Sequence, residues 1–95
     1  EIMVTHDCPY TVSKKLFVDE GKALTSENIE TRTSQAFEAM FQIHKPKLWI
    51  FGHWHNDADE VINDTRFICL DELTDIVVDV NSCEVTQGFN HSALI

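Results

Sequence analysis

The chain has 95 residues and a net charge of −9, a length that allows one domain at most. The sequence has 7 Lys and Arg residues against 16 Asp and Glu residues, so we do not expect the basic stripe that nucleic-acid binding requires. No segment reaches the roughly 20 apolar residues of a membrane span, and a membrane is not an expected partner. The three cysteines have no C-x-x-C spacing, which predicts free thiols in a reducing, cytoplasmic compartment.

The first predicted strand covers residues 2–5 and ends on His6, before Pro9 stops both strand pairing and helix. Residues 10–33 are polar and mixed, and we interpret them as a long loop. A histidine therefore stands where the first strand ends.

One amphipathic helix is predicted over residues 34–45, with Thr33 or Ser34 as its N-cap. Its apolar residues recur at helical spacing, and we assign Phe37, Met40 and Phe41 to the core. His44 lies in the predicted last turn, where the helix dipole favours a surface histidine. We therefore do not expect His44 to be a ligand.

The second half of the chain is predicted to be rich in strands. A buried strand at 48–51 is followed by two hairpins, the first of residues 60–62 and 65–70 and the second of residues 75–80 and 83–86. Residues 88–95 are expected to be a tail, in which His91 has no companion group. These elements predict a mixed α/β chain with one main helix. One helix cannot cover both faces of five or six strands, so we expect partners outside the chain.

The strand at 48–51 leads into Gly52-His53-Trp54-His55. On extended chain, side chains two residues apart point to the same side and rise about 6.6 Å, which predicts that His53 and His55 share a face. Gly52 has no Cβ and is expected to let backbone or ligand come close. A bare H-x-H also occurs in ordinary surface turns. Together with His6, however, it supplies three imidazoles at strand ends, the outline of a metal site.

The chain resembles the C-terminal half of the calcineurin-like metallophosphoesterases. Val4-Thr5-His6-Asp7-Cys8-Pro9 is similar to their penultimate histidine motif, and Gly52-His53-Trp54-His55 is similar to their closing G-H-x-H. The resemblance implies half of a β-sandwich flanked by helices, with residues 1–95 as a single partial domain. It also implies a centre of two divalent ions (Mn, Fe, Zn or Ni) at which a hydroxide attacks a phosphate ester. His6 and His53 would bind one ion and His55 the other.

The D-x-H, G-D-x-x-D and G-N-H motifs of the family's first half have no counterpart in this sequence. The resemblance places the bridging aspartate, the asparagine ligand and the histidine that acts as general acid in that half. The expected partner is therefore an N-terminal half or another copy of the chain. The isolated chain is expected to be inactive and unstable as a monomer, because its strand edges would be unpaired.

Two further interpretations stay open at this point. The chain could be a non-catalytic binding or interaction module with a degenerate metal site, or could hold a single zinc ion by its three histidines alone. For the substrate phosphate, Lys14, Lys15 and Arg32 are candidate contacts, although exposed basic residues in a loop are usually only solvated. The kind of phosphate ester is set by loops and is not predicted.

Overall fold

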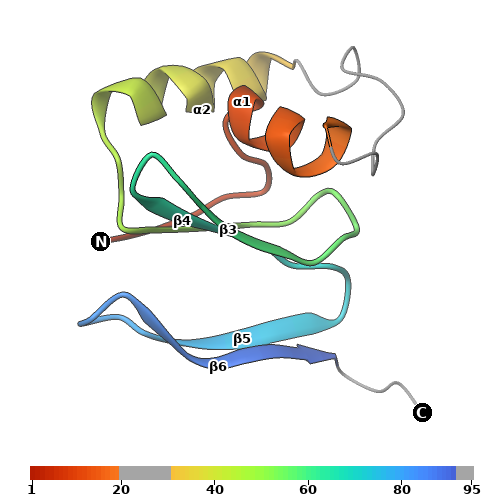
Figure 1. Ribbon diagram of the computed structural model, residues 1–95, viewed down its shortest axis with the longest axis vertical. Helices are drawn as coiled ribbons and strands as arrows, with labels where there is room; N and C mark the ends of the chain where they lie inside the picture. The colour runs from red at the N-terminus through yellow and green to blue at the C-terminus, as the bar shows by residue number, and fades with distance from the viewer. Residues whose placement is uncertain (20–30, 92–95) are drawn as a thin grey trace. The chain divides into compact units, whose positions relative to one another are not determined.

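The computed structural model describes residues 1–19 and 31–91 (Figure 1). They fall into two compact units, one formed by residues 1–6 with the chain from Pro46 onward, the other by residues 7–45. The first unit contains the strands and the second the helices, so the mixed α/β class is confirmed at that level. Within the described ranges, no helix has both the length and the apolar character that crossing a membrane requires.

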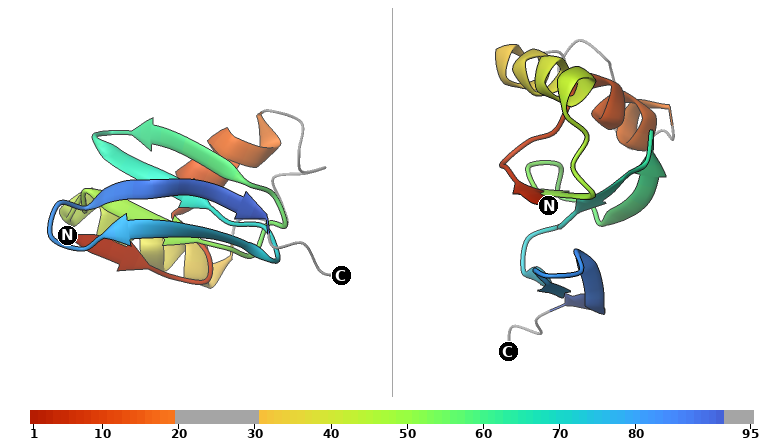
Figure 2. Two further views of the ribbon diagram at one scale, coloured as in Figure 1. Left: turned by 90° about the horizontal axis from the view of Figure 1, so that it is seen from below. Right: turned by 90° about the vertical axis from the view of Figure 1, so that its left-hand side faces the viewer.

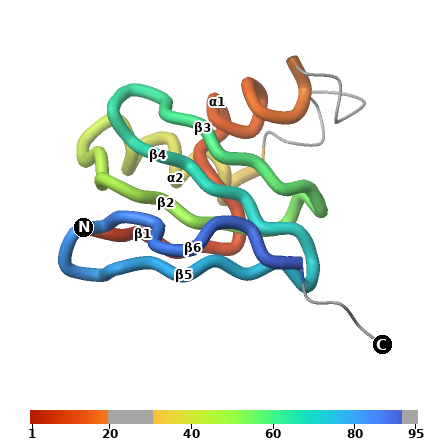
Figure 3. Tube along the Cα trace, turned by 60° about the horizontal axis from the view of Figure 1, so that its bottom comes forward, coloured from red at the N-terminus to blue at the C-terminus, as the bar shows by residue number. Residues whose placement is uncertain are grey.

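A four-stranded sheet with the order β1-β2-β4-β3 forms the centre of the first unit. β2 (Leu48–Phe51) lies between β1 (Ile2–Val4) and β4 (Thr65–Cys69) and is parallel to both. β3 (Ala58–Ile62) is antiparallel to β4, as expected of a hairpin. Figure 3 shows the traces of β2, β4 and β3 side by side. The predicted strand at 48–51 is thus one of the two interior strands of a largely parallel arrangement.

The side chains of β2 explain why this strand is central. Leu48 and Trp49 point to opposite faces of the sheet, and both are fully buried. The Trp49 ring stacks on Phe67 of β4 with ring centroids 5.6 Å apart, and its Nε1 donates to Thr5 Oγ1 at 2.7 Å. A continuous apolar run buried on both sides is typical of a parallel strand.

The β3–β4 hairpin turns at Asn63 and Asp64, as predicted. Both residues have positive φ, 49° and 70°, the combination that a type I′ turn needs and that Asn and Asp tolerate. Arg66 donates to both carboxylate oxygens of Asp59 across the hairpin, at 2.8 and 2.6 Å, and this bidentate contact raises the pKa of Arg66.

The second hairpin, β5 (Thr74–Asp79) with β6 (Glu84–His91), forms a separate two-stranded sheet (Figure 2). β6 is longer than predicted, and Asn90 and His91 lie opposite Asp75 and Thr74. The interpretation of residues 88–91 as a tail is therefore wrong, while 92–95 lie outside the described residues. Residues 88–91 were not predicted as a strand because Gly88 lies among them, and glycine within a β-strand weakens the strand pattern of a sequence.

The first part of the predicted loop is helical in the second unit. α1 (Tyr10–Ser13) continues into a π-helix, η1 (Lys14–Val18), in which the Asp19 N–H donates to Lys14 O at 2.9 Å. The loop prediction is wrong for these residues, and residues 20–30 lie outside the described ranges. Val12, Leu16 and Phe17 have helical spacing and are buried. The polar residues around them obscured this apolar pattern in the sequence.

The main helix, α2 (Arg32–Ile43), starts two residues earlier than predicted. Its N-cap is Thr31, which forms a capping box with Ser34 through reciprocal bonds of 3.0 and 2.8 Å. Phe41 is buried as predicted, whereas Met40 is 43% exposed. His44 follows the helix in an extended conformation and is exposed, in agreement with the surface interpretation.

Glu38 links the two helices of this unit. Its Oε1 accepts from the Thr11 N–H at 2.9 Å and from Thr11 Oγ1 at 2.7 Å, and its Oε2 accepts from Gln42 at 2.6 Å. Burial alone would raise the pKa of Glu38, but these hydrogen bonds outweigh it and hold the pKa below its usual value. The carboxylate form is therefore the one that stabilises the contact between α1 and α2.

Candidate metal centre

The candidate site lies at the edge of the four-stranded sheet where β1, β2 and β4 end. Because these strands are parallel, their carboxyl ends meet at one edge, where open α/β sheets commonly bind ligands. The ladder continues past the strands: the Gly52 N–H donates to His6 O at 3.0 Å, and the Leu70 N–H to Phe51 O at 2.9 Å. The segments after the three strands are thereby held next to one another.

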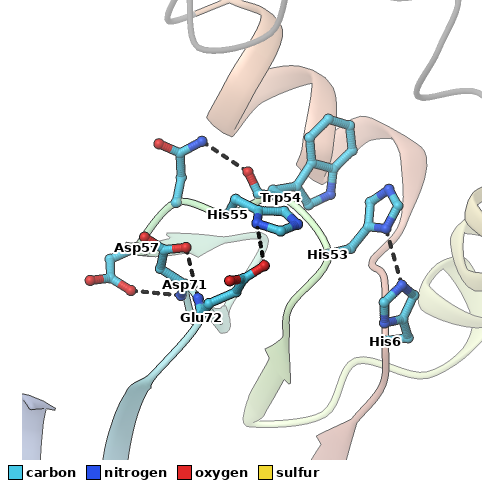
Figure 4. A network of polar contacts seen from close by, with 8 residues as sticks. His6, His53, Trp54, His55, Asp57, Asp71 and Glu72 are labelled. Carbon is cyan, nitrogen blue, oxygen red and sulfur yellow. Dashed lines mark hydrogen bonds and ion pairs between the residues drawn. The ribbon is translucent and has the colours of Figure 1, made fainter. Parts of the chain in front are cut away.

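His6 and His53 are brought into direct contact at this edge (Figure 4). His6 Nε2 and His53 Nδ1 lie 3.0 Å apart, and the rings meet edge to face with centroids 4.9 Å apart. Both side chains are exposed. One of the two nitrogens must carry the proton of this hydrogen bond, so binding an ion between them would require that proton to leave.

His55 points away from this pair. Its Nδ1 lies 2.9 Å from Glu72 Oε1, in the segment that follows β4 (Figure 4). The prediction that His53 and His55 share a face is wrong, because the chain is not extended here: φ is 75° at His53 and 55° at His55. Left-handed backbone is uncommon for non-glycine residues and is found at functional sites more often than elsewhere.

Close approach of the protein backbone, one of the two roles predicted for Gly52, is not found, while close approach of a ligand stays a prediction. A Cβ at this position would lie 3.7 Å from Leu70 O and 4.0 Å from His6 O, which are ordinary van der Waals distances. The protein backbone therefore does not require glycine here.

A hollow of about 350 Å³ opens at the sheet edge between the three histidines and the segment after β4. It is lined by His6, His53, His55, Leu70, Asp71 and Glu72. Asp71 and Glu72 were not predicted as site residues. Their position follows from the parallel pairing of β2 with β4, which no local sequence pattern shows, although an acidic pair directly after an apolar strand was a usable signal.

The segment that carries Glu72 is held by Asp57. Asp57 Oδ1 accepts from the Asp71 N–H at 2.8 Å, and Oδ2 contacts Thr74 Oγ1 at 3.4 Å and His91 Nε2. Burial alone would raise the pKa of Asp57, but these hydrogen bonds lower it below its usual value. His91, expected to have no companion, therefore pairs with Asp57 from the end of β6.

The separation of His6 and His53 can be compared with that of two ligands on one metal ion. Two imidazole nitrogens about 2.1 Å from one ion lie about 3.0 Å apart at neighbouring octahedral positions, and about 3.4 Å apart in the tetrahedral arrangement usual for zinc. The nitrogens of His6 and His53 are separated by 3.0 Å, so they suit two neighbouring positions on one ion. Over residues 1–19 and 31–91, however, no group of three or more His, Cys, Asp or Glu side chains is arranged to hold a metal ion.

The other candidate residues belong to the helical unit. Lys14 forms an ion pair with Asp19 at 3.2 Å, and Arg32 is the first residue of α2 and is exposed. Their role toward a substrate phosphate stays a prediction. All three cysteines are free thiols, as predicted, and Cys69 is buried in β4.

Comparisons of the chain with protein-family models, curated proteins and solved structures found no match. The functional interpretation therefore depends on the two histidine motifs and on the geometry of the sheet edge. His6, His53 and His55, the histidines of the two motifs, all line the same hollow in the first unit.

Proposed function

We propose that this chain supplies metal ligands to a calcineurin-like phosphoesterase, with His6 and His53 on one divalent ion and His55 on its neighbour. The supporting observation is the 3.0 Å contact between His6 Nε2 and His53 Nδ1, two residues that lie 47 positions apart. Both belong to the motifs that resemble the family. A two-ion centre would supply Lewis acidity and an activated water for hydrolysis of a phosphate ester.

The residues of this chain would then hold and separate the ions. Paired ions in such centres lie about 3.5–4 Å apart. His55 follows His53 by two residues and contacts Glu72, whereas His53 contacts His6, a placement that suits ligands to different ions. Imidazole ligands fit Mn, Fe, Zn or Ni, and the donor set does not select among them.

The remaining ligands would come from a polypeptide with the D-x-H, G-D-x-x-D and G-N-H motifs, either an N-terminal half or a second chain. Among the described strands, β1 is at the edge of the sheet and is paired only with β2. A parallel strand added beside β1 would end next to His6, where the set of ligands is incomplete. In this proposal the described strands form half of a β-sandwich that the partner completes.

Metal binding by the histidine variants tests this proposal. We expect calorimetric titration with Mn²⁺ or Zn²⁺ of the longest reading frame that contains this chain to show affinity at least about 100-fold weaker in His6→Ala and His53→Ala, since even outer-shell changes cost 10–100-fold. His44→Ala is the matched control, because its exposed side chain lies outside the hollow. Equal affinity in His53→Ala and His44→Ala would refute the assignment.

Hydrolysis separates the enzyme from a binding module. The assay follows cleavage of bis(p-nitrophenyl) phosphate by the longest reading frame that contains this chain. His55→Ala should abolish turnover while leaving one ion bound. A reading frame that binds metal but lacks the three upstream motifs and any turnover would favour the interaction module. Full activity with a single zinc ion would favour the mononuclear site.

A further inference from the structure

Side-chain contacts join the β5–β6 hairpin to the four-stranded sheet, since no strand pairing does so among the described strands. β5 and β6 pair with each other and form a sheet of their own. All residues of β6 except Val85 are exposed. A hairpin of two strands is marginally stable in water by itself. The contacts at its ends therefore bear on how firmly the hairpin is held.

Asp57, the residue that precedes β3, anchors the open end of the hairpin. Thr74 begins β5 and His91 ends β6, and these two residues lie opposite each other. Asp57 Oδ2 is hydrogen-bonded to Thr74 Oγ1 at 3.4 Å and to His91 Nε2. The chain that leads from β4 also attaches Thr74 to the sheet, whereas His91 is at the far end of β6. The bond to His91 therefore keeps the end of β6 at the sheet.

The same carboxylate also anchors the wall of the hollow. Its second oxygen, Oδ1, accepts from the Asp71 N–H at 2.8 Å, and Asp71 lines the hollow (Figure 4). The Thr74 N–H closes this turn by donating to Asp71 O at 3.1 Å. A carboxylate group is planar, so its two oxygens move together. Loss of His91 from Oδ2 therefore releases the group to turn and weakens its bond to Asp71.

We propose that the end of β6 is a strap whose attachment at Asp57 sets the position of the hollow's wall. With His91 on Oδ2, the carboxylate is held and keeps the Asp71 turn in place. When His91 leaves, the carboxylate turns and the wall loosens. This device needs no bound ion, so it goes beyond the proposed function and does not depend on it.

The exposure of the contact suits a device that opens. The side chain of His91 is 68% exposed and that of Asp57 is 20% exposed. Water competes for a contact with so exposed a partner, so the contact contributes little to folding stability. The attached and detached forms of the end of β6 then differ little in free energy. A ligand or partner that prefers one form would shift the balance between them.

A second contact, at the other end of the hairpin, provides the matched control. Lys47 Nζ donates to Ser82 O at 3.1 Å, in the turn between β5 and β6. Lys47 directly precedes β2, at the opposite end of that strand from the hollow. Releasing this contact therefore loosens the hairpin without acting on Asp57.

The test follows backbone amides by NMR in the longest reading frame that contains this chain, labelled with ¹⁵N. In His91→Ala, hydrogen exchange at the open end of the hairpin should be about 2–5-fold faster, as for loss of an exposed contact. The Asp71 amide proton should move upfield, because its hydrogen bond to Asp57 weakens. Lys47→Met should speed exchange at the turn of the hairpin and leave the Asp71 amide proton unmoved.

His91→Gln separates the hydrogen bond from the ring. Its side-chain NH₂ group can donate to Asp57, so both measurements should stay close to those of the unaltered protein. Because this variant also lacks the imidazole, it excludes a ring-current effect on the Asp71 amide proton.

The inference is overturned if His91→Ala leaves the Asp71 amide proton unmoved, since the strap would then have no connection with the hollow. It is also overturned if His91→Gln or Lys47→Met moves this proton as far as His91→Ala does. The shift would then report loss of the ring or general loosening of the hairpin. Metal binding does not enter these measurements, so failure of the metal titrations would refute the proposed function and leave this result standing.

Discussion

Replacing His53 or His55 by glycine should give a more stable protein than replacing it by alanine. Both residues have left-handed backbone, with φ of 75° and 55°. This conformation brings the Cβ of an L-residue close to the following carbonyl oxygen, while glycine adopts it freely. Alanine and glycine remove the same ring and lose the same contacts with His6 or Glu72. The difference between the two variants therefore isolates the backbone.

The expected size follows from two opposing terms. The left-handed region costs a non-glycine residue roughly 1–2 kcal/mol, and glycine costs roughly 0.5–1 kcal/mol more than alanine through the entropy of the unfolded chain. The middle of each range gives a difference of about 0.75 kcal/mol in favour of glycine at His53 and at His55, within bounds of about 0 and 1.5 kcal/mol. His44, with φ of −136°, is the control, and there alanine should be the more stable variant.

The assay is urea unfolding of the six variants, followed by the fluorescence of the buried Trp49. Alanine equal to or better than glycine at both His53 and His55 would refute the assignment of strained backbone. If glycine were better at His44 as well, the effect would not be specific to the site. A further expectation is that no glycine variant at His53 regains metal binding.

Three other predictions concern single contacts. Thr65→Val should destabilise the protein by about 1–3 kcal/mol in urea unfolding. The fully buried Thr65 hydroxyl donates to Pro46 O at 2.6 Å, and the substitution leaves that carbonyl unpaired. An unchanged unfolding midpoint would contradict this prediction. Gly52→Ala should change the unfolding free energy by less than about 0.5 kcal/mol, since the added Cβ has room, and a collapse of the fold would show that the glycine is required. Glu38 has a folded pKa below its unfolded value of about 4.3, so its contribution is present above that pH and is lost as pH falls through the folded pKa. Glu38→Gln should therefore flatten the loss of stability between about pH 5 and pH 3, whereas parallel midpoint curves for the two proteins would contradict it.

The strands were predictable because their signals are local. The apolar run at 48–51 and the Asn63-Asp64 turn define β2 and the β3–β4 hairpin without reference to any other part of the chain. The helical turns at 10–18 carried an equally local signal in Val12, Leu16 and Phe17. The Lys14-Lys15 pair and nearby turn residues masked that signal, because a short helix leaves too few residues to show a period.

The site was predictable only in part, for a geometric reason. Histidines at strand ends could be found in the sequence, and parallel pairing does bring His6 to His53. The assumption of extended chain beyond β2 failed, since alternation applies only while φ stays in the β region. Glu72 could not be assigned to His55, because their proximity depends on the pairing of β2 with β4 and on the Asp57 anchor.

The histidine segment after β2 is locally unfavourable, and this bears on its function. The exposed contacts of His53 and His55 contribute little to stability, while left-handed backbone at each of them costs about 1 kcal/mol or more. Such a conformation persists because surrounding bonds determine it, here those of the Gly52 N–H with His6 O and the Trp54 N–H with Gly52 O. Folding thus fixes two imidazoles in directions that the isolated segment would not favour. In the proposed function, each ring binds a different ion, and the binding of the two ions would offset that cost.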